Sequence, residues 1–216
     1  MKKKHALVIG ATGASGQEIV KFLLKDPIYD TVNIFVRRKV DSTNVKLKVN
    51  VIDFSQLHLY KDLIKGDILF SALGTTLKDA GTKEKQFLVD YTYQYDFAKI
   101  ASENGVDTLS LISSIGANKK SFFFYPKIKG KLEESIKLLP FKKIQIYQPP
   151  SLIRQVELMR FGEKISVKLF HWLTGIGFFK SLKPISVTFL ASKIVSNSHL
   201  KKTDRVTTFK SVDIFN

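Results

Sequence analysis

The sequence contains no cysteine, and this absence excludes several kinds of chemistry. Without thiols the chain forms no disulfide, no thiolate metal site and no cysteine nucleophile. Its four histidines are scattered along the chain, without the spacing that metal ligands show. These absences predict a protein without a metal site, in a cytoplasmic location.

Long hydrophobic runs are also missing. No stretch approaches the roughly 18 uninterrupted apolar residues that a membrane-spanning helix needs. The basic start, "MKKKHALVIG" (1–10), has an apolar run too short for a signal peptide, and we expect none there. The shares of hydrophobic residues, 44%, and of charged residues, 25%, are ordinary for a globular protein. We therefore predict that residues 1–216 form a single domain with a sizeable core.

Acidic residues are scarce: 19 Asp and Glu stand against 35 Lys and Arg, which gives a formal net charge of +16. Such a charge favours anionic partners, whether nucleotides, nucleic acid or lipids. The lysines are spread over the whole chain, however, and no DNA- or RNA-recognition motif is present. We expect a small-molecule substrate and no nucleic-acid partner. A weak contact of the basic surface with an anionic membrane or a protein, and assembly into an oligomer, stay open.

Apolar runs typical of β-strands alternate with helical stretches in the first two thirds of the chain. The expected strands are residues 5–10, 32–36, 48–53, 67–73, 108–114 and 143–149. The expected helices are residues 15–25, 83–104 and 126–138. This alternation predicts an α/β fold with a doubly wound parallel sheet, covered by helices on both faces.

The alternation stops after Pro149 and Pro150. The remainder, residues 151–216, shows helical stretches near 156–173 and 185–199 and then a polar tail. We predict that it forms a small C-terminal helical extension. Such an extension would cover the substrate side, at the carboxyl edge of the sheet where open α/β folds bind ligands.

A glycine-rich loop, "VIGATGASGQEIV" (8–20), joins the first expected strand to the first helix. In a Rossmann-type fold the first glycine allows the sharp turn, the second admits a pyrophosphate, and the third lets helix and strand pack closely. The helix N-terminus offers free N–H groups to the phosphates. The strand–loop–helix context is the one this motif requires. The predicted cofactor contacts here are Gly10, Thr12, Gly13, Ala14, Ser15 and Gly16.

The end of the second expected strand indicates which dinucleotide binds. An NAD site usually has an acidic residue about 20 residues after the glycines, for the ribose 2′-hydroxyl. Here the segment reads "IFVRRK" (34–39), and Arg37 and Arg38 stand at the strand end instead. Guanidinium groups suit a 2′-phosphate. The sequence therefore predicts NADP(H).

Two later strand ends complete the expected cofactor site. Asp53 follows the third strand, where it can accept a hydrogen bond from the adenine amino group or cap the next helix; both roles stay open. Phe54 is assigned to the same region. The segment "SALGTT" (71–76) follows the fourth strand, and its Leu73 and Gly74 are expected beside the nicotinamide ribose.

Taken in order, these pieces resemble a known family. The matching segments are "GATGASG", "RRK", "VIDF", "LGTT…AG", "LISSIGANKKS", "FYPKIKGKLE" and "YQPPSLIR". The sequence resembles the atypical short-chain dehydrogenase/reductases, and within them the HIV Tat-interacting protein 2-like group of NAD(P)H-binding oxidoreductases. The likeness runs from residue 8 to about residue 154.

The resemblance implies an enzyme that reduces a carbonyl group, or catalyses the reverse reaction, with a serine and a Tyr-x-x-x-Lys pair. Carried over to this sequence, the catalytic residues are Ser114, Tyr125 and Lys129. Ser113 is the alternative serine and is assigned to the cofactor site. Pro126 lies inside the Tyr-x-x-x-Lys unit, where we expect it to begin the helix.

In this interpretation Tyr125 donates the proton, Lys129 stabilises its phenolate form and Ser114 orients the carbonyl oxygen. A second interpretation is a regulatory protein that senses NADPH without turnover. A third is a peripheral membrane protein that uses residues 164–183, although the glycines in that segment favour core packing. The aromatic run "SFFF" (121–124) is expected to pack or to line the substrate pocket rather than to insert into a membrane.

Overall fold

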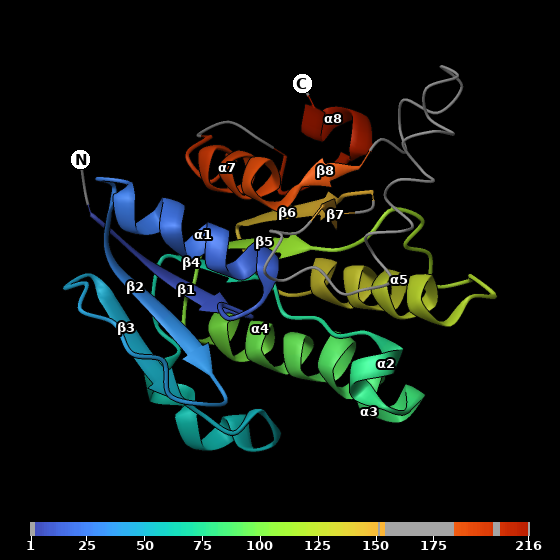
Figure 1. The fold of residues 1–216 in the computed structure, drawn as a ribbon, viewed down its shortest axis with the longest axis horizontal. Helices are drawn as coiled ribbons and strands as arrows, with labels where there is room; N and C mark the ends of the chain where they lie inside the picture. Colours follow the sequence, from blue (N-terminus) through green and yellow to red (C-terminus); the bar gives the residue numbers. More distant parts are fainter. Residues whose placement is uncertain (1–2, 151, 154–183, 201–203, 216) are drawn as a thin grey trace.

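The computed structural model describes residues 3–150, 152–153, 184–200 and 204–215 (Figure 1). The helical stretch expected at 156–173 and the amphipathic segment 164–183 lie outside the described residues. None of the described helices is long and apolar enough to cross a membrane.

A seven-stranded parallel sheet forms the centre of the fold, in the order β3-β2-β1-β4-β5-β6-β9. Its strands are β1 (Lys4–Ile9), β2 (Tyr29–Val36), β3 (Leu47–Val51), β4 (Ile68–Ser71), β5 (Thr108–Ile112), β6 (Lys143–Gln148) and β9 (Val206–Lys210). A separate parallel pair joins β7 (Leu152–Ile153) to β8 (Ile185–Ser186). The predicted doubly wound, Rossmann-type α/β fold is confirmed.

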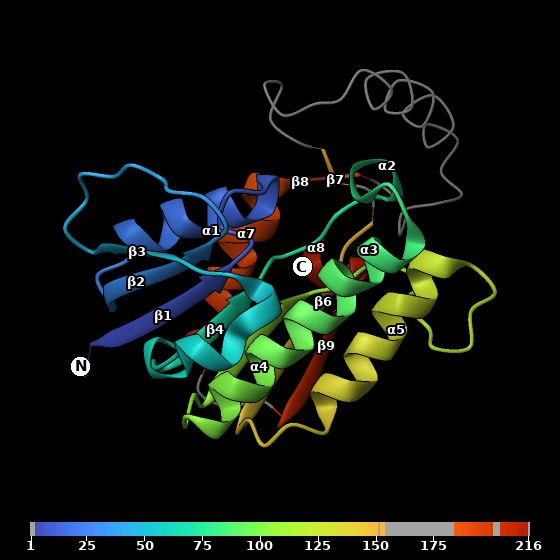
Figure 2. The same cartoon turned by 90° about the horizontal axis from the view of Figure 1, so that it is seen from below.

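Helices cover both faces of the sheet (Figure 2). One face carries α1 (Ala14–Lys25) and α7 (Val187–Asn197), which pack against each other. The other face carries α4 (Tyr93–Glu103), α5 (Phe124–Lys137) and the 3₁₀ segment Phe54–Leu63. The shorter helices are α2 (Leu77–Ala80), α3 (Lys83–Phe87) and α8 (Ser211–Phe215).

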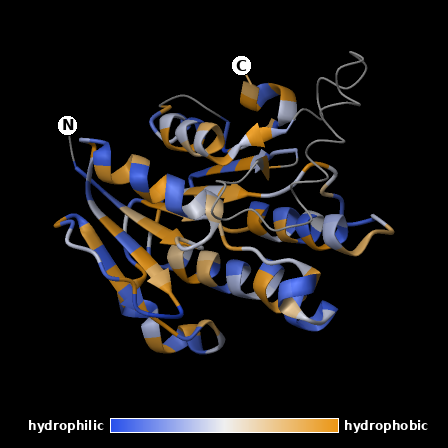
Figure 3. Cartoon of the chain, in the orientation of Figure 1, coloured by the Kyte–Doolittle hydropathy of each residue, from blue (hydrophilic) through white to orange (hydrophobic). Residues whose placement is uncertain are grey.

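The central strands are largely hydrophobic because both of their faces are covered (Figure 3). In β1, Leu7 and Ile9 belong to the core under α4 and α5, whereas Ala6 and Val8 belong to the core under α1 and α7. All four side chains are fully buried. Successive strand residues point to opposite faces, so one apolar run supplies two cores.

The C-terminal end differs from the expected polar tail. Residues 206–210 form β9, which pairs with β6 at the edge of the sheet. The prediction of a tail is wrong for this segment. Strand β9 lies at the edge of the sheet and is only half-buried. It therefore contains polar threonines and lacks the hydrophobic pattern of a central strand.

Two expected helices also differ in detail. The predicted helix 83–104 consists of α3, a π-helical segment (Leu88–Thr92) and α4 in direct succession. The helix expected to begin at Pro126 begins instead at Phe124, with Phe123 as its N-cap. Pro126 therefore stands in the first turn, where the first N–H groups of a helix lack partners, so the proline removes no helical hydrogen bond.

Candidate active site

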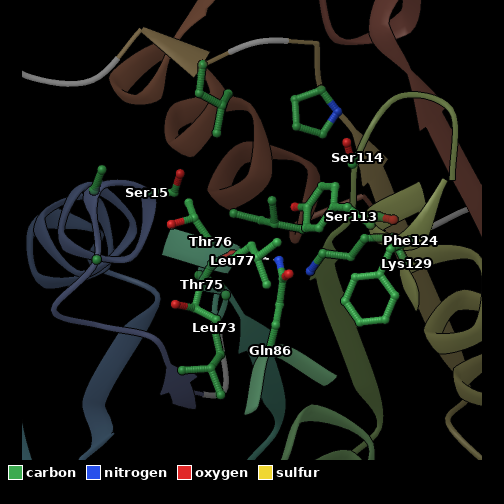
Figure 4. A pocket seen from close by; sticks show the side chains of 18 of the residues that line it. Ser15, Leu73, Thr75, Thr76, Leu77, Gln86, Ser113, Ser114, Phe124 and Lys129 are labelled. Atoms are coloured by element: carbon green, nitrogen blue, oxygen red, sulfur yellow. Dashed lines mark hydrogen bonds between the residues drawn. The ribbon is translucent and has the colours of Figure 1, made fainter. Parts of the chain in front are cut away.

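A pocket of about 790 Å³ opens at the carboxyl ends of β1, β4, β5 and β6 (Figure 4). Its wall combines segments that are distant in sequence: the glycine loop, the chain after β4, α3, the serines after β5, the start of α5 and the chain after β6. Of the predicted site residues, the pocket is lined by Gly13, Ala14, Ser15, Leu73, Gly74, Ser113, Ser114, Tyr125 and Lys129. A parallel sheet gathers these residues because its strands all end at the same edge.

The glycine loop has the shape that its sequence predicts. Gly10 has a φ of +78°, and a Cβ there would lie 2.4 Å from the carbonyl carbon of Ala72. A Cβ at Gly16 would lie 2.1 Å from the Gly10 carbonyl oxygen. Gly10 therefore lets the loop turn against the end of β4, and Gly16 lets α1 approach β1.

The N-terminus of α1 has the features of an anion site. Gly13, its N-cap, makes no side-chain hydrogen bond, and the first turn holds no acidic residue. The first N–H groups of the helix thus face the pocket beside Gly13 without a side-chain cap, and the helix dipole adds a partial positive charge there. Thr12 is exposed just outside, and its carbonyl oxygen accepts a hydrogen bond from Gln17 Nε2 at 3.2 Å. These residues fit a pyrophosphate group.

Arg37 and Arg38 follow β2 and are exposed. Neither guanidinium has an ion-pair or hydrogen-bond partner among the described residues. Strand β2 neighbours β1 in the sheet, and neither arginine lines the pocket itself. Both are free to bind an anionic group at this side of the glycine loop.

Asp53 caps the 3₁₀ segment that follows it. Its Oδ1 accepts hydrogen bonds from the Ser55 N–H at 2.8 Å and from the Ser55 hydroxyl at 2.7 Å. These hydrogen bonds lower the pKa of Asp53 below its ordinary value. Phe54 is 5% exposed and packs against Tyr93 and Phe97, so its ring belongs to the core.

The two serines after β5 have different surroundings. Ser113 is 5% exposed, and its hydroxyl donates to the buried carboxylate of Glu133. Gln148 donates to both oxygens of that carboxylate, at 3.0 Å each. Ser114 is half-buried, and within the described residues its hydroxyl donates only to the neighbouring Ile115 carbonyl oxygen, at 3.2 Å. Ser114 is therefore the serine whose hydroxyl is more readily available to a ligand.

Tyr125 and Lys129 lie one turn apart on α5. Tyr125 is 38% exposed, and its hydroxyl makes no hydrogen bond with the residues that the structure describes. Lys129 is 2% exposed, and its Nζ lies 5.9 Å from the centre of the Tyr125 ring. Figure 4 shows Lys129 reaching from α5 into the pocket toward Gln86.

Lys129 has a buried counter-ion that the sequence does not predict. Asp90 lies in the π-helical segment, is 0% exposed, and holds its Oδ1 3.4 Å from Lys129 Nζ. Its Oδ2 accepts a hydrogen bond from the Thr75 N–H at 3.2 Å. Burial raises the pKa of the Asp90 carboxyl above its ordinary value, and the charge of Lys129 partly offsets this effect.

Buried polar side chains near Asp90 form further hydrogen bonds. Gln94 donates to the Asp90 carbonyl oxygen at 3.0 Å and accepts from the Ser71 hydroxyl at 2.9 Å. Gln86 Nε2 donates a hydrogen bond to the Thr75 carbonyl oxygen at 3.4 Å. The sequence pattern that could have predicted this network is the four-residue spacing of Gln86, Asp90 and Gln94. The four-residue spacing places them on one face.

Comparison with known proteins agrees with this geometry. Residues 10–137 match the model of a family described as NAD(P)H-binding. The chain is 34% identical over 187 residues to Protein FMP52, mitochondrial, of Candida albicans, covering 84% of this chain and 82% of the relative. It is 30% identical over 184 residues to Protein HTATIP2 of Rattus norvegicus, covering 81% and 76%. The resemblance proposed from sequence is confirmed.

Solved structures share the fold at low sequence identity. MoeE5 in complex with UDP-glucuronic acid and NAD superposes with a TM-score of 0.72 and 16% identity, covering 95% of this chain and 76% of that one. The UDP-N-acetylglucosamine 4-epimerase of Methanobrevibacter ruminantium M1 gives a TM-score of 0.71 and 15% identity, covering 97% and 77%. At this identity the likeness concerns the fold alone.

The comparison also corrects one expectation. The absence of cysteine, of long hydrophobic runs and of a signal peptide predicts a cytoplasmic location. That prediction is wrong, because the relatives in Candida albicans, Debaryomyces hansenii and Kluyveromyces lactis are named mitochondrial proteins. A lack of cysteines and of membrane-spanning runs describes many compartments equally well, so composition was a poor guide to location.

Proposed function

The chain belongs to the NAD(P)H-binding family, and we propose that it is an NADPH-dependent oxidoreductase that reduces a carbonyl group of a small substrate. One observation carries the proposal: a single pocket is bounded both by the glycine loop at Gly13–Ser15 and by Ser114, Tyr125 and Lys129. A dinucleotide and a reacting carbonyl need these two sets of groups in one cavity.

Two parts of the chain would hold the cofactor. The N–H groups at Ala14 and Ser15 suit the pyrophosphate. Arg37 and Arg38 suit a 2′-phosphate, which supports NADPH over NADH. When bound, the nicotinamide cofactor supplies the hydride, which is chemistry that no side chain provides.

The side chains at the other end of the pocket would handle the proton. The Ser114 hydroxyl donates to the carbonyl oxygen and fixes its orientation. The Tyr125 hydroxyl then donates its proton to the oxygen as negative charge develops there. Lys129 places a positive charge beside the Tyr125 ring, and Asp90 keeps this lysine in position.

Turnover with a panel of carbonyl compounds tests this function. We expect NADPH oxidation with at least one compound, and Tyr125→Phe should lower kcat by about 10²–10⁴-fold. Tyr95→Phe, on α4 and outside the pocket wall, is the matched control and should leave kcat unchanged. Equal turnover by Tyr125→Phe and the unmodified protein would contradict the proposed role of the hydroxyl.

A second candidate is a cofactor sensor without turnover. It is favoured by the pairing of Lys129 with Asp90, because a compensated lysine stabilises a tyrosinate less than a free one. In that case the protein binds NADPH, measured by fluorescence titration, while no compound in the panel is reduced.

A further inference from the structure

Two neighbouring aromatic side chains stand in solvent beside the pocket. Phe122 is 104% exposed and Phe123 is 76% exposed, relative to a free residue. Phe124 lines the pocket with Lys83 Nζ 5.5 Å from the centre of its ring. The expectation that the whole aromatic run packs or lines the pocket is thus wrong for Phe122 and Phe123. Burying a phenylalanine fully is worth roughly 1.5–3 kcal/mol, so displaying two of them needs a reason.

The segment that carries these rings, residues 118–123, is called the aromatic loop. It is held by its own hydrogen bonds: Asn118 accepts from the N–H of Lys120 at 2.8 Å and from the N–H of Ser121 at 2.9 Å. The Phe123 N–H donates to Ser121 Oγ at 3.1 Å. The display of the two rings is therefore built into the loop.

Helix α5 anchors the same loop at its base. The Asn118 N–H donates to the Pro126 carbonyl oxygen at 3.0 Å. Gly130 permits close contact, because a Cβ there would lie 2.3 Å from the backbone nitrogen of Lys119. A pre-organised loop loses little conformational entropy when its tip binds something.

Positively charged residues lie close to the exposed rings in the sequence. Within five residues of the two rings on either side, the exposed lysines are Lys119, Lys120 and Lys127. Glu134 lies 3.4 Å from Lys119, but both side chains are about half exposed, so this pair is weak. Lys120 and Lys127 have no ion-pair partner within the described residues. The tip therefore combines apolar rings with net positive charge, in a protein whose total charge is +16.

We propose that the aromatic loop docks the protein onto an anionic lipid bilayer, with Phe122 and Phe123 inserted at the boundary of headgroups and acyl chains. Aromatic rings flanked by lysines are the side chains that bind such an interface. The loop stands out from the body beyond the start of α5 in both views (Figures 1 and 2). A projecting tip of this kind enters a deformable lipid surface readily.

The size of the patch favours lipid over a protein partner. Two phenylalanine rings bury at most about 300–500 Å² together. A stable protein interface needs about 800 Å² on each partner. Lipid binding has no such threshold, because each inserted ring and each nearby lysine adds to the affinity separately. This inference does not depend on the proposed reaction.

Co-sedimentation of the full chain with lipid vesicles tests the proposal. We expect binding to vesicles of phosphatidylcholine mixed with phosphatidylglycerol, and much weaker binding to phosphatidylcholine alone. Phe122→Ser combined with Phe123→Ser should weaken binding to the anionic vesicles by about tenfold or more. The matched control is Leu138→Ser, because Leu138 is 85% exposed at the other end of α5.

A second pair of variants tests the charges. Lys120→Glu with Lys127→Glu should lower the affinity by about thirtyfold or more, since each lysine near an anionic surface contributes about fivefold. The control pair, Lys25→Glu with Lys48→Glu, changes the net charge equally on other parts of the surface. Thermal unfolding should be unchanged in all variants, because every altered side chain is exposed.

Three results would overturn the proposal. The first is no binding to anionic vesicles by the unmodified protein. The second is equal binding after removal of both phenylalanines. The third is concentration-dependent self-association in sedimentation velocity that the phenylalanine variant abolishes, since the rings would then contact a second copy of the chain. NADPH binding, measured in parallel, should stay constant and shows that the pocket is intact.

Discussion

Lys129 contributes both to the stability of the fold and to the proposed reaction. Its ammonium group is almost fully buried, 3.4 Å from the Asp90 carboxylate and 5.9 Å from the centre of the Tyr125 ring. A lone buried ammonium is unfavourable, because it loses hydration without compensation. Asp90 supplies the missing charge and thereby holds the lysine beside the tyrosine.

Replacing Asp90 by asparagine should therefore be far more damaging than a typical polar substitution. The amide keeps the shape of the carboxylate but leaves Lys129 as an uncompensated buried charge. We expect a loss of about 3–5 kcal/mol in the free energy of unfolding, measured by urea denaturation. Adding Lys129→Met to Asp90→Asn should recover most of that loss. If the double variant is as unstable as the single one, the ion pair is not the cause.

Arg37 and Arg38 determine the expected preference between the two cofactors. Each guanidinium is free of partners within the described residues, so a 2′-phosphate would replace only water around it. Arg37→Ala and Arg38→Ala, made singly, should weaken NADPH binding by about 10- to 100-fold and leave NADH binding nearly unchanged. Fluorescence titration measures both. Lys39→Ala is the control, because Lys39 is exposed and lies 3.6 Å from Asp41. Equal losses for NADPH and NADH would refute the assignment.

The sequence predicts some of these residues and not others, and the reason is physical. Tyr125 and Lys129 lie on one helix, so a local spacing places them together. Asp90 meets Lys129 only through the packing of two helices on the sheet, and no local pattern records that contact. The two serines show the same limit, because only the tertiary structure shows Ser113 bound to Glu133.

At the scale of elements, the glycine loop and α1 act as one unit. Gly16 brings the helix against the turn at Gly10, and the uncapped N-terminus of the helix faces the pocket. Different glycines permit the close packing of the helix and the access of phosphates to its N-terminus. Gly16 is surrounded by backbone, whereas a Cβ at Gly13 would meet only the Gly10 carbonyl oxygen, at 3.3 Å.

This division predicts opposite effects of two similar substitutions. Gly16→Ala would place a methyl group 2.1 Å from a backbone oxygen that has no room to move, and should destabilise the fold by on the order of 3 kcal/mol. Gly13→Ala fits the ordinary backbone angles there, φ −82° and ψ 166°, and should change stability by less than about 1 kcal/mol. It should instead weaken NADPH binding at least about tenfold, by blocking the approach of the phosphates. Thermal unfolding and cofactor titration of both variants separate the two effects.

The sheet shows which elements a sequence pattern predicts well. Strands β1, β4, β5 and β6 are central and covered on both faces, so apolar residues dominate each of them. Strand β9 is an edge strand with half-buried residues, and its pattern resembles that of a loop. Similarly, Pro126 indicated a helix boundary correctly to within one turn, although the N-cap is Phe123.

At the scale of the whole molecule, the C-terminal residues complete the sheet. The Ile144 N–H donates to the Arg205 carbonyl oxygen at 2.7 Å, and Phe209 stacks on Tyr147 with ring centres 4.8 Å apart. Ile214 on α8 is buried in the core under α1 and α7. The chain thus returns after the nucleotide-binding segment to cover the edge of β6. That residues 1–216 form a single domain stays a prediction, which thermal unfolding tests.

Removing residues 204–216 should therefore prevent folding. The truncated chain would expose the hydrogen-bonding edge of β6 and the face of Tyr147, and an uncovered hydrophobic edge strand promotes aggregation. We expect loss of the cooperative thermal transition and increased light scattering, whereas removal of Asn216 alone should change neither. Phe209→Ala tests the same contact mildly, with an expected loss of about 2 kcal/mol at this half-buried site. A truncated chain that still unfolds cooperatively and binds NADPH would mean that β9 is an appendage, and that the sheet from β3 to β6 suffices for the fold.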